Sequence, residues 1–121
     1  MKDLELGAVQ EKFAGIVWEN EPVSSGDLVK LCEKQLKWKK PTTYTVLRKL
    51  CEKGLLKNED GTVRSVISRE DYYRARSEQV VEGSFNGSLP AFVAAFISAK
   101  GISHEEAEKL RAMIDAYSKE G

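Results

Sequence analysis

Apolar residues recur every three or four positions along much of the chain, which is the spacing of amphipathic helices. The first predicted helix covers residues 7–20 and ends before Pro22, because proline disfavours helix in the residue before it. A second is expected from an N-cap at Ser24 or Ser25 to Leu36. The apolar positions on the inward faces of these two helices are Val9, Phe13, Ile16, Val17, Leu28, Leu31, Cys32 and Leu36.

The third predicted helix carries the most informative pattern in the chain. Pro41 suits its first turn, where the missing N–H costs no hydrogen bond, and Gly54 fits the left-handed residue that follows a helix. The residues spaced to face inward are Thr43, Val46, Leu47 and Leu50. The face left outward combines hydroxyl groups with cations, in Thr42, Tyr44, Thr45, Arg48 and Lys49.

Two short strands are predicted directly after this helix, at residues 55–59 and 62–67. Between them stands Asp60-Gly61, a dipeptide favoured in the two-residue type I′ turn of a β-hairpin. An amphipathic helix that ends at a glycine and is followed by a hairpin is the sequence pattern of a winged helix-turn-helix. The pattern therefore indicates DNA binding.

The chain changes character at Ser68, where an acidic first turn begins a fourth helix that runs to about residue 82. Ser88 is expected to cap a fifth helix, which Gly101 ends. A sixth helix begins at Ser103 with a capping box.

The fourth to sixth helices carry more large apolar side chains than about fifty residues can bury among themselves. We therefore expect a homodimer, whose two-fold symmetry predicts a palindromic operator. The alternative is an intrachain core that folds back on the first helix. The expected interface residues are Tyr72, Tyr73, Phe85, Phe92, Phe96, Ile97, Leu110, Ile114 and Tyr117. The predicted fold is mainly α with a small β-wing, a winged helix-turn-helix in residues 1–67 followed by a three-helix dimerisation region in residues 68–121.

The formal net charge is zero, which by itself argues against a nucleic-acid-binding protein. The distribution of charge reverses that interpretation. Residues 30–57 contain nine basic and two acidic residues, so this segment carries a net charge of +7 and the rest of the chain carries −7. Because screening limits electrostatic fields to about 8–10 Å, a phosphate backbone near this segment responds to its local charge.

Within this basic segment, Thr42, Tyr44 and Thr45 are assigned to base-facing positions, and Arg48 and Lys49 to the phosphate backbone. Further expected DNA contacts are Lys39 and Lys40 before the helix and Arg64 on the wing, whereas Trp38 is expected to pack under the linker. Two alternatives stay open: a merely solvated helix face, and a winged-helix protein-interaction module without DNA binding.

Other classes of function find little support in the sequence. Cys32 and Cys51 lack metal-ligand spacing and are interpreted as buried thiols of a cytosolic protein. The single histidine, His104, lies in a helical first turn, and neither a nucleophile elbow nor a phosphate loop occurs. No signal peptide is visible, and the longest uncharged run, residues 83–99, is too short to span a membrane. We expect a cytoplasmic protein that is not an enzyme and has no metal, cofactor or membrane insertion.

Four motifs occur along the chain in a fixed order. They are Thr42-x-x-Thr45-Val46-Leu47-x-Lys49-Leu50-x-x-Lys53-Gly54-Leu55-Leu56, Ser68-Arg69-Glu70-Asp71-Tyr72, Phe85-Asn86-Gly87-Ser88-Leu89 with Phe92-Val93, and Ile102-Ser103-x-Glu105-Glu106-x-x-x-Leu110. Together they resemble the penicillinase-repressor (BlaI/MecI) family of bacterial winged-helix regulators, which also includes copper-responsive relatives. The resemblance implies a homodimer that binds an operator through its N-terminal half and interlocks through its C-terminal helices.

In antibiotic-responsive members, a membrane sensor metalloprotease signal leads to cleavage in the C-terminal half, which releases the gene. The family's cleavage junction aligns with Phe92-Val93 here. The chain departs from the family pattern at Pro41 and Tyr44, where basic residues are common, which predicts a different operator. The second wing strand is shorter and lacks the usual aromatics, and the cysteine pairs of the copper branch are absent.

Overall fold

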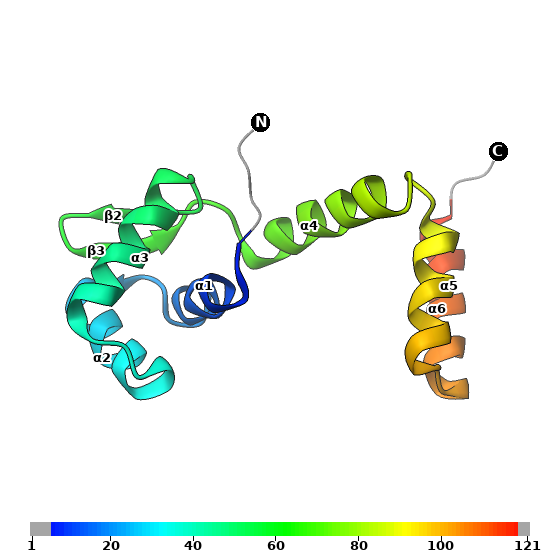
Figure 1. Cartoon of the computed structure of the whole chain (residues 1–121), viewed down its shortest axis with the longest axis horizontal. Helices are drawn as coiled ribbons and strands as arrows, with labels where there is room; N and C mark the ends of the chain where they lie inside the picture. Colours follow the sequence, from blue (N-terminus) through cyan, green and yellow to red (C-terminus); the bar gives the residue numbers. More distant parts are fainter. Residues whose placement is uncertain (1–5, 119–121) are drawn as a thin grey trace. The chain divides into compact units, whose positions relative to one another are not determined.

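The computed structural model describes residues 6–118, and it divides the chain into two compact units, Met1–Gln79 and Val80–Gly121 (Figure 1). The predicted fold class, a winged helix followed by C-terminal helices, is confirmed. The first unit contains α1 (Ala8–Asn20), β1 (Val23–Ser24), α2 (Ser25–Leu36), α3 (Lys40–Glu52), β2 (Leu56–Glu59), β3 (Thr62–Ser65) and the first part of α4 (Arg69–Ser84). The second contains the end of α4, α5 (Leu89–Lys100) and α6 (His104–Tyr117).

The predicted helix ends are formed by the expected residues. Ser24 Oγ accepts a hydrogen bond of 3.1 Å from the Asp27 amide at the start of α2. After α3, Gly54 has a φ of 86°, and the Leu55 amide donates to the Leu50 carbonyl over 3.0 Å. This is the Schellman arrangement, which satisfies carbonyl groups at the end of α3 and turns the chain toward β2.

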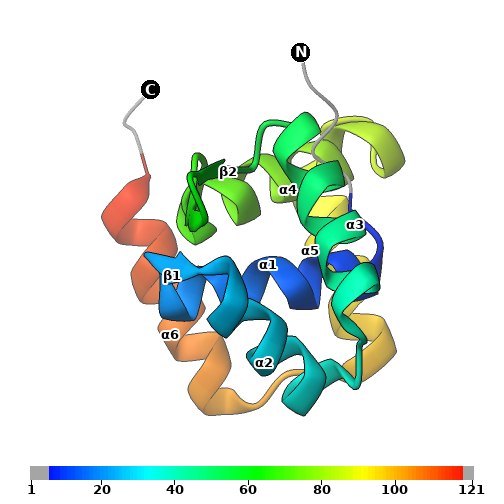
Figure 2. The ribbon, with the colours of Figure 1, turned by 90° about the vertical axis from the view of Figure 1, so that its left-hand side faces the viewer.

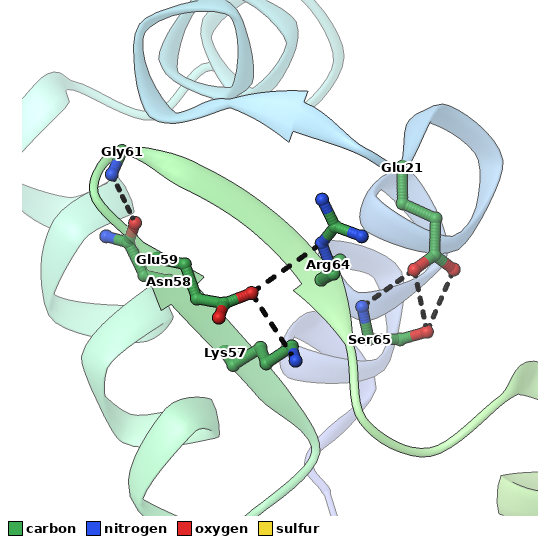
Figure 3. A network of polar contacts seen from close by, with 7 residues as sticks. All are labelled: Glu21, Lys57, Asn58, Glu59, Gly61, Arg64 and Ser65. Atoms are coloured by element: carbon green, nitrogen blue, oxygen red, sulfur yellow. Dashed lines mark hydrogen bonds and ion pairs between the residues drawn. The ribbon is translucent and has the colours of Figure 1, made fainter.

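The wing is a three-stranded antiparallel sheet of order β1-β3-β2, in which Glu59 pairs with Thr62. Asp60 and Gly61 both have positive φ angles, of 51° and 88°, as the predicted type I′ turn requires. The two-residue strand β1 was not predicted. The segment that leads into β1 is held against the end of β3, because the Glu21 carboxylate accepts hydrogen bonds of 2.7 and 2.8 Å from the amide and hydroxyl of Ser65 (Figure 3).

The helices α1, α2 and α3 and the wing enclose the core of the first unit (Figure 2). Its fully buried side chains include Phe13, Val17, Leu28, Cys32, Leu50, Leu55, Leu56 and Val63. Trp38 stacks on Phe13 with ring centroids 5.7 Å apart, as expected for a residue packed under the linker. Two predictions need correction: Val9, expected on the inward face of the first helix, is 53% exposed, and Cys51, interpreted as a buried thiol, is only half-buried.

Tyr72 of α4 belongs to this core, which corrects its assignment to a dimer interface. Its side chain has no exposed surface, and its ring lies 5.5 Å from that of Trp18 on α1. Its hydroxyl donates to Glu11 Oε2 over 3.1 Å. Burial, helped by this carboxylate, raises the pKa of Tyr72 to about 12. For this residue the alternative of an intrachain core against the first helix is correct, and the first unit therefore extends beyond residue 67.

In the second unit, Ser88 and Ser103 cap α5 and α6 as predicted, and Ser103 forms a complete capping box with Glu106. None of the described residues 80–118 is fully buried. No single helix in residues 6–118 is long and apolar enough to cross a membrane, and only α4 and α5 taken together across a sharp bend reach that length and composition.

Candidate nucleic-acid interface

The outward face of α3 carries the predicted combination of hydroxyl groups and cations. Thr42, Thr45, Arg48 and Lys49 are all exposed. The ion pairs of the described residues lie on the wing, between α1 and α4, and along α4 and α6. Within residues 6–118, Arg48 and Lys49 thus have no carboxylate partner to offset their charge.

The hydroxyl groups of α3 differ in what they can offer a ligand. Thr45 is exposed, and its Oγ1 donates its proton to the Pro41 carbonyl over 2.9 Å, so its oxygen lone pairs remain free to accept. Such a group can accept from a base amino group or contact a thymine methyl. Thr43 is buried, and its hydroxyl is directed back to the Lys39 carbonyl over 3.4 Å.

The N-terminus of α3 has the features of an anion-binding site. Its N-cap residue, Lys39, provides no side-chain hydrogen bond, and no acidic residue lies in the first turn. By contrast, serine side chains cap α2, α5 and α6. The amide groups at the start of α3, together with exposed Lys39 and Lys40, therefore form a positive end at which a phosphate is favoured.

Tyr44 does not share the fully exposed position of its neighbours on α3, although the helical spacing placed it on the same outward face. Its ring is half-buried and packs against the core. Its hydroxyl donates to Ser25 Oγ over 3.2 Å, and Lys40 Nζ lies 6.0 Å from its ring centroid. Only part of this side chain is thus available to a partner.

The wing carries its own acidic group. Glu59 Oε1 lies 3.4 Å from Lys57 Nζ and 3.9 Å from Arg64 Nε (Figure 3). All three side chains are about half or more exposed, so these pairs contribute little to stability. Arg64 is exposed as predicted, but Glu59 offsets part of its charge.

An open hollow of 360 Å³ lies at the surface between α3 and β2. It is lined by Tyr44, Leu47, Arg48, Cys51 and Asn58. Asn58 was not among the predicted residues. Its signal in the sequence is its place shortly before the Asp60-Gly61 turn, where asparagine side chains commonly bond the backbone. Burial raises the pKa of the Cys51 thiol, and Glu52 adds to this effect, so the thiol in the hollow is neutral.

A second surface lies in the C-terminal unit, where α5 and α6 form an apolar groove of 450 Å³. Phe92, Val93, Phe96, Ile97 and Leu110 contribute to its lining. Phe85 packs edge-on against Phe92, with ring centroids 5.5 Å apart. Beyond the groove, Ile114 is 64% and Tyr117 81% exposed. The expected interface residues other than Tyr72 are thus at least partly accessible to a partner.

Comparison with known proteins identifies the family of the chain. Residues 6–116 match the family model described as penicillinase repressor. The chain belongs to the penicillinase repressor family. Members of this family are regulators and not enzymes, so the penicillinase-repressor homologue described here is a transcriptional repressor by family, and the expectation that it is not an enzyme is confirmed.

Individual relatives of this penicillinase-repressor homologue are similar over 83–96% of their length. The penicillinase repressor of Bacillus licheniformis is 24% identical over 106 residues, which cover 84% of this chain and 83% of the relative. The methicillin resistance regulatory protein MecI of Mammaliicoccus sciuri is 20% identical over 118 residues, or 94% of this chain and 96% of the relative. The MecI protein of Staphylococcus aureus strain N315 has the same identity and coverage.

Proposed function

We propose that the chain is a homodimeric repressor that binds a palindromic double-stranded operator through α3. The observation that supports this most is the exposed face of α3, where hydroxyl groups stand beside cations without carboxylate partners. Although the whole chain is neutral, residues 30–57 carry a net charge of +7, and the like charges gathered in this segment repel one another at a cost in free energy. A polyanionic ligand offsets that cost.

The proposed roles follow from the position of each side chain. With α3 in the major groove, Thr42 and Thr45 face base edges, while Arg48 and Lys49 contact phosphates. Lys39 and Lys40 meet the backbone at the start of α3. Arg64 reaches the backbone or the adjacent minor groove from the wing.

Dimerisation is proposed through α5 and α6. Residues 80–118 contain no fully buried side chain, although apolar residues dominate the facing surfaces of the two helices. A second copy that covers this surface supplies the core that the unit lacks. The two-fold symmetry of such a dimer places its recognition helices at half-sites about 34–36 Å apart or multiples of that distance.

Relief of repression by proteolysis is proposed at the aligned junction, Phe92-Val93. This peptide bond lies inside α5, and Phe92 is half-buried. Because proteases bind their substrates as extended strands, we expect cleavage to require local unwinding of α5. Incubation with a cognate sensor metalloprotease should yield a fragment that begins at Val93, measured by mass spectrometry. A fragment that begins elsewhere, or intact protein, contradicts this site.

DNA binding can be tested without knowing the operator sequence. The measurement is how the affinity for a duplex of arbitrary sequence depends on salt concentration. A protein that contacts phosphates releases counterions, so its binding constant falls linearly with salt concentration on logarithmic axes, by a slope of about −0.9 for each contact. We expect Arg48→Ala and Lys49→Ala each to reduce that slope by about 0.9, as measured by fluorescence anisotropy.

Arg74→Ala is the matched control for these variants. Arg74 is an exposed cation on α4, outside the basic segment, and Asp71 already pairs with it. Its removal should leave the slope unchanged. A wild-type chain whose interaction with duplex is absent or insensitive to salt supports the protein-interaction module instead.

A further inference from the structure

Tyr44 connects α3 to the beginning of α2. Its hydroxyl donates to Ser25 Oγ over 3.2 Å, although the two residues are 19 positions apart. Ser25 is the first residue of α2, and its side chain is half-buried. This hydrogen bond therefore joins the recognition helix to the helix that precedes it, at a point close to the molecular surface.

Ser25 in turn contacts the tip of the wing. Its amide donates to the Gly61 carbonyl over 2.8 Å. The Gly61 amide donates to Asn58 Oδ1 over 3.0 Å, as Figure 3 shows. A continuous series of hydrogen bonds thus runs from Tyr44 through Ser25 and Gly61 to Asn58. It spans α3, α2, the wing turn and β2.

This series of hydrogen bonds lies at the surface, beside an open hollow. A 360 Å³ hollow that Tyr44 and Asn58 help to line lies at the surface between α3 and β2. Below this surface hollow, Leu47 and Leu50 of α3 share the apolar core with Leu56 of β2, so packing holds the inner sides of the two elements together. The hydrogen bonds through Ser25 bridge the elements at the edge of the hollow.

We propose that Tyr44 is a positioning residue that fixes the wing turn relative to α3, and that it acts through Ser25 rather than by reading a base. Arg64 lies on β3, three residues after Gly61, so the position of the wing turn determines where its guanidinium meets the duplex. This inference rests on the proposed DNA binding. It replaces the base-facing role that helical spacing suggested for Tyr44.

The test compares Tyr44→Phe and Ser25→Ala, each alone and combined with Arg64→Ala, in full-length protein. Tyr44→Phe keeps the ring and removes only the hydroxyl group. Each single variant should weaken duplex binding by about 2- to 10-fold, the range for loss of one hydrogen bond. In the wild type, Arg64→Ala should reduce the salt slope by up to about 0.9. In either variant background, the same substitution should change the slope by less than half as much.

A second measurement separates positioning from base reading. Duplexes selected from a random pool should have the same preferred sequence for wild type, Tyr44→Phe and Ser25→Ala. Ser77→Ala, which removes a hydroxyl group that donates to the Tyr73 carbonyl on α4, is the control and should match wild type in affinity and slope. Thermal melting by tryptophan fluorescence should agree among these variants within a few degrees, because the substitutions lie at the edge of the core.

The results distinguish two kinds of failure. A wild-type protein that lacks salt-dependent duplex binding removes the proposed function, and this inference with it. If the wild type binds duplex but Tyr44→Phe selects a different preferred sequence, the positioning role is overturned and the proposed function stands. The positioning role also fails if Arg64→Ala changes the slope equally in all backgrounds, or leaves it unchanged in the wild type.

Discussion

Replacing Phe96 by aspartate is expected to convert the protein from a dimer to a monomer at micromolar concentration. Phe96 lines the groove between α5 and α6, yet 57% of its surface is exposed within one chain. Burial of a phenylalanine side chain stabilises by about 1.5–3 kcal/mol. In a two-fold symmetric dimer the substitution occurs twice, so a loss of about 3–6 kcal/mol is expected, which raises the dissociation constant by roughly 10²- to 10⁴-fold.

Analytical ultracentrifugation measures this change directly. Ala94→Asp is the matched control, because it adds the same charge to α5 two residues earlier, on the opposite side of the helix from Phe96. We expect Ala94→Asp to remain dimeric and Phe96→Asp to sediment as a monomer with weakened duplex binding. A wild-type chain that is monomeric at the same concentration contradicts the dimer proposal. An unaffected dimer in Phe96→Asp places the interface elsewhere.

Tyr72→Ala is expected to destabilise the winged-helix unit by about 3–5 kcal/mol, the usual cost of removing a large buried aromatic side chain. The substitution removes the ring contact with Trp18 and leaves Glu11 without one of its hydrogen-bond donors. Both tryptophans of the chain, Trp18 and Trp38, lie in this unit. Urea denaturation followed by tryptophan fluorescence therefore reports the stability of the winged-helix unit alone.

Tyr73→Ala is the control for this loss. The Tyr73 hydroxyl also donates to Glu11, over 3.3 Å, but 44% of the residue is exposed. We expect a cost of about 1 kcal/mol or less, since an exposed site leaves no cavity. Tyr72→Phe should lie between the two, at about 1 kcal/mol for the lost hydrogen bond. If Tyr72→Ala weakened dimerisation and left urea unfolding of the first unit unchanged, Tyr72 would belong to the interface after all.

Much of the fold follows from local chemistry that the sequence displays. The serine caps of α2, α5 and α6 bond the expected amide groups, and Gly54 ends α3 in the left-handed conformation. The wing turn has the predicted type I′ geometry because Asp60 and Gly61 tolerate positive φ angles. In each case the interaction lies within a few residues, so sequence spacing alone specifies it.

The missed features depend on contacts between distant segments. Tyr72 has the helical spacing of an interface residue, but its partners Glu11 and Trp18 are about sixty and fifty residues away. The strand β1 exists because Val23 pairs with Val63 and the Glu21 carboxylate bonds Ser65. A two-residue strand has no periodicity of its own from which it can be predicted.

In the candidate interface, too, the local features were predicted from the sequence and the long-range contact was missed. Helical spacing predicted that Thr42, Thr45, Arg48 and Lys49 face outward, and the structure exposes all four. It also placed Tyr44 among them, but the hydroxyl group reaches Ser25 and draws the ring partly inward. Spacing gives the direction in which a side chain leaves its helix, whereas the length of that side chain and its polar partners decide where it ends.

The most direct test of the central claim is the salt slope of duplex binding for the wild type and for the double variant Arg48→Ala/Lys49→Ala. The control is Arg74→Ala/Arg111→Ala, which also removes two cations, each paired with a carboxylate on its own helix. If α3 contacts phosphates through Arg48 and Lys49, the double variant should reduce the slope by about 1.8 and the control should leave it unchanged. Equal slopes for wild type and the double variant, or a wild-type slope near zero, would contradict DNA binding through α3.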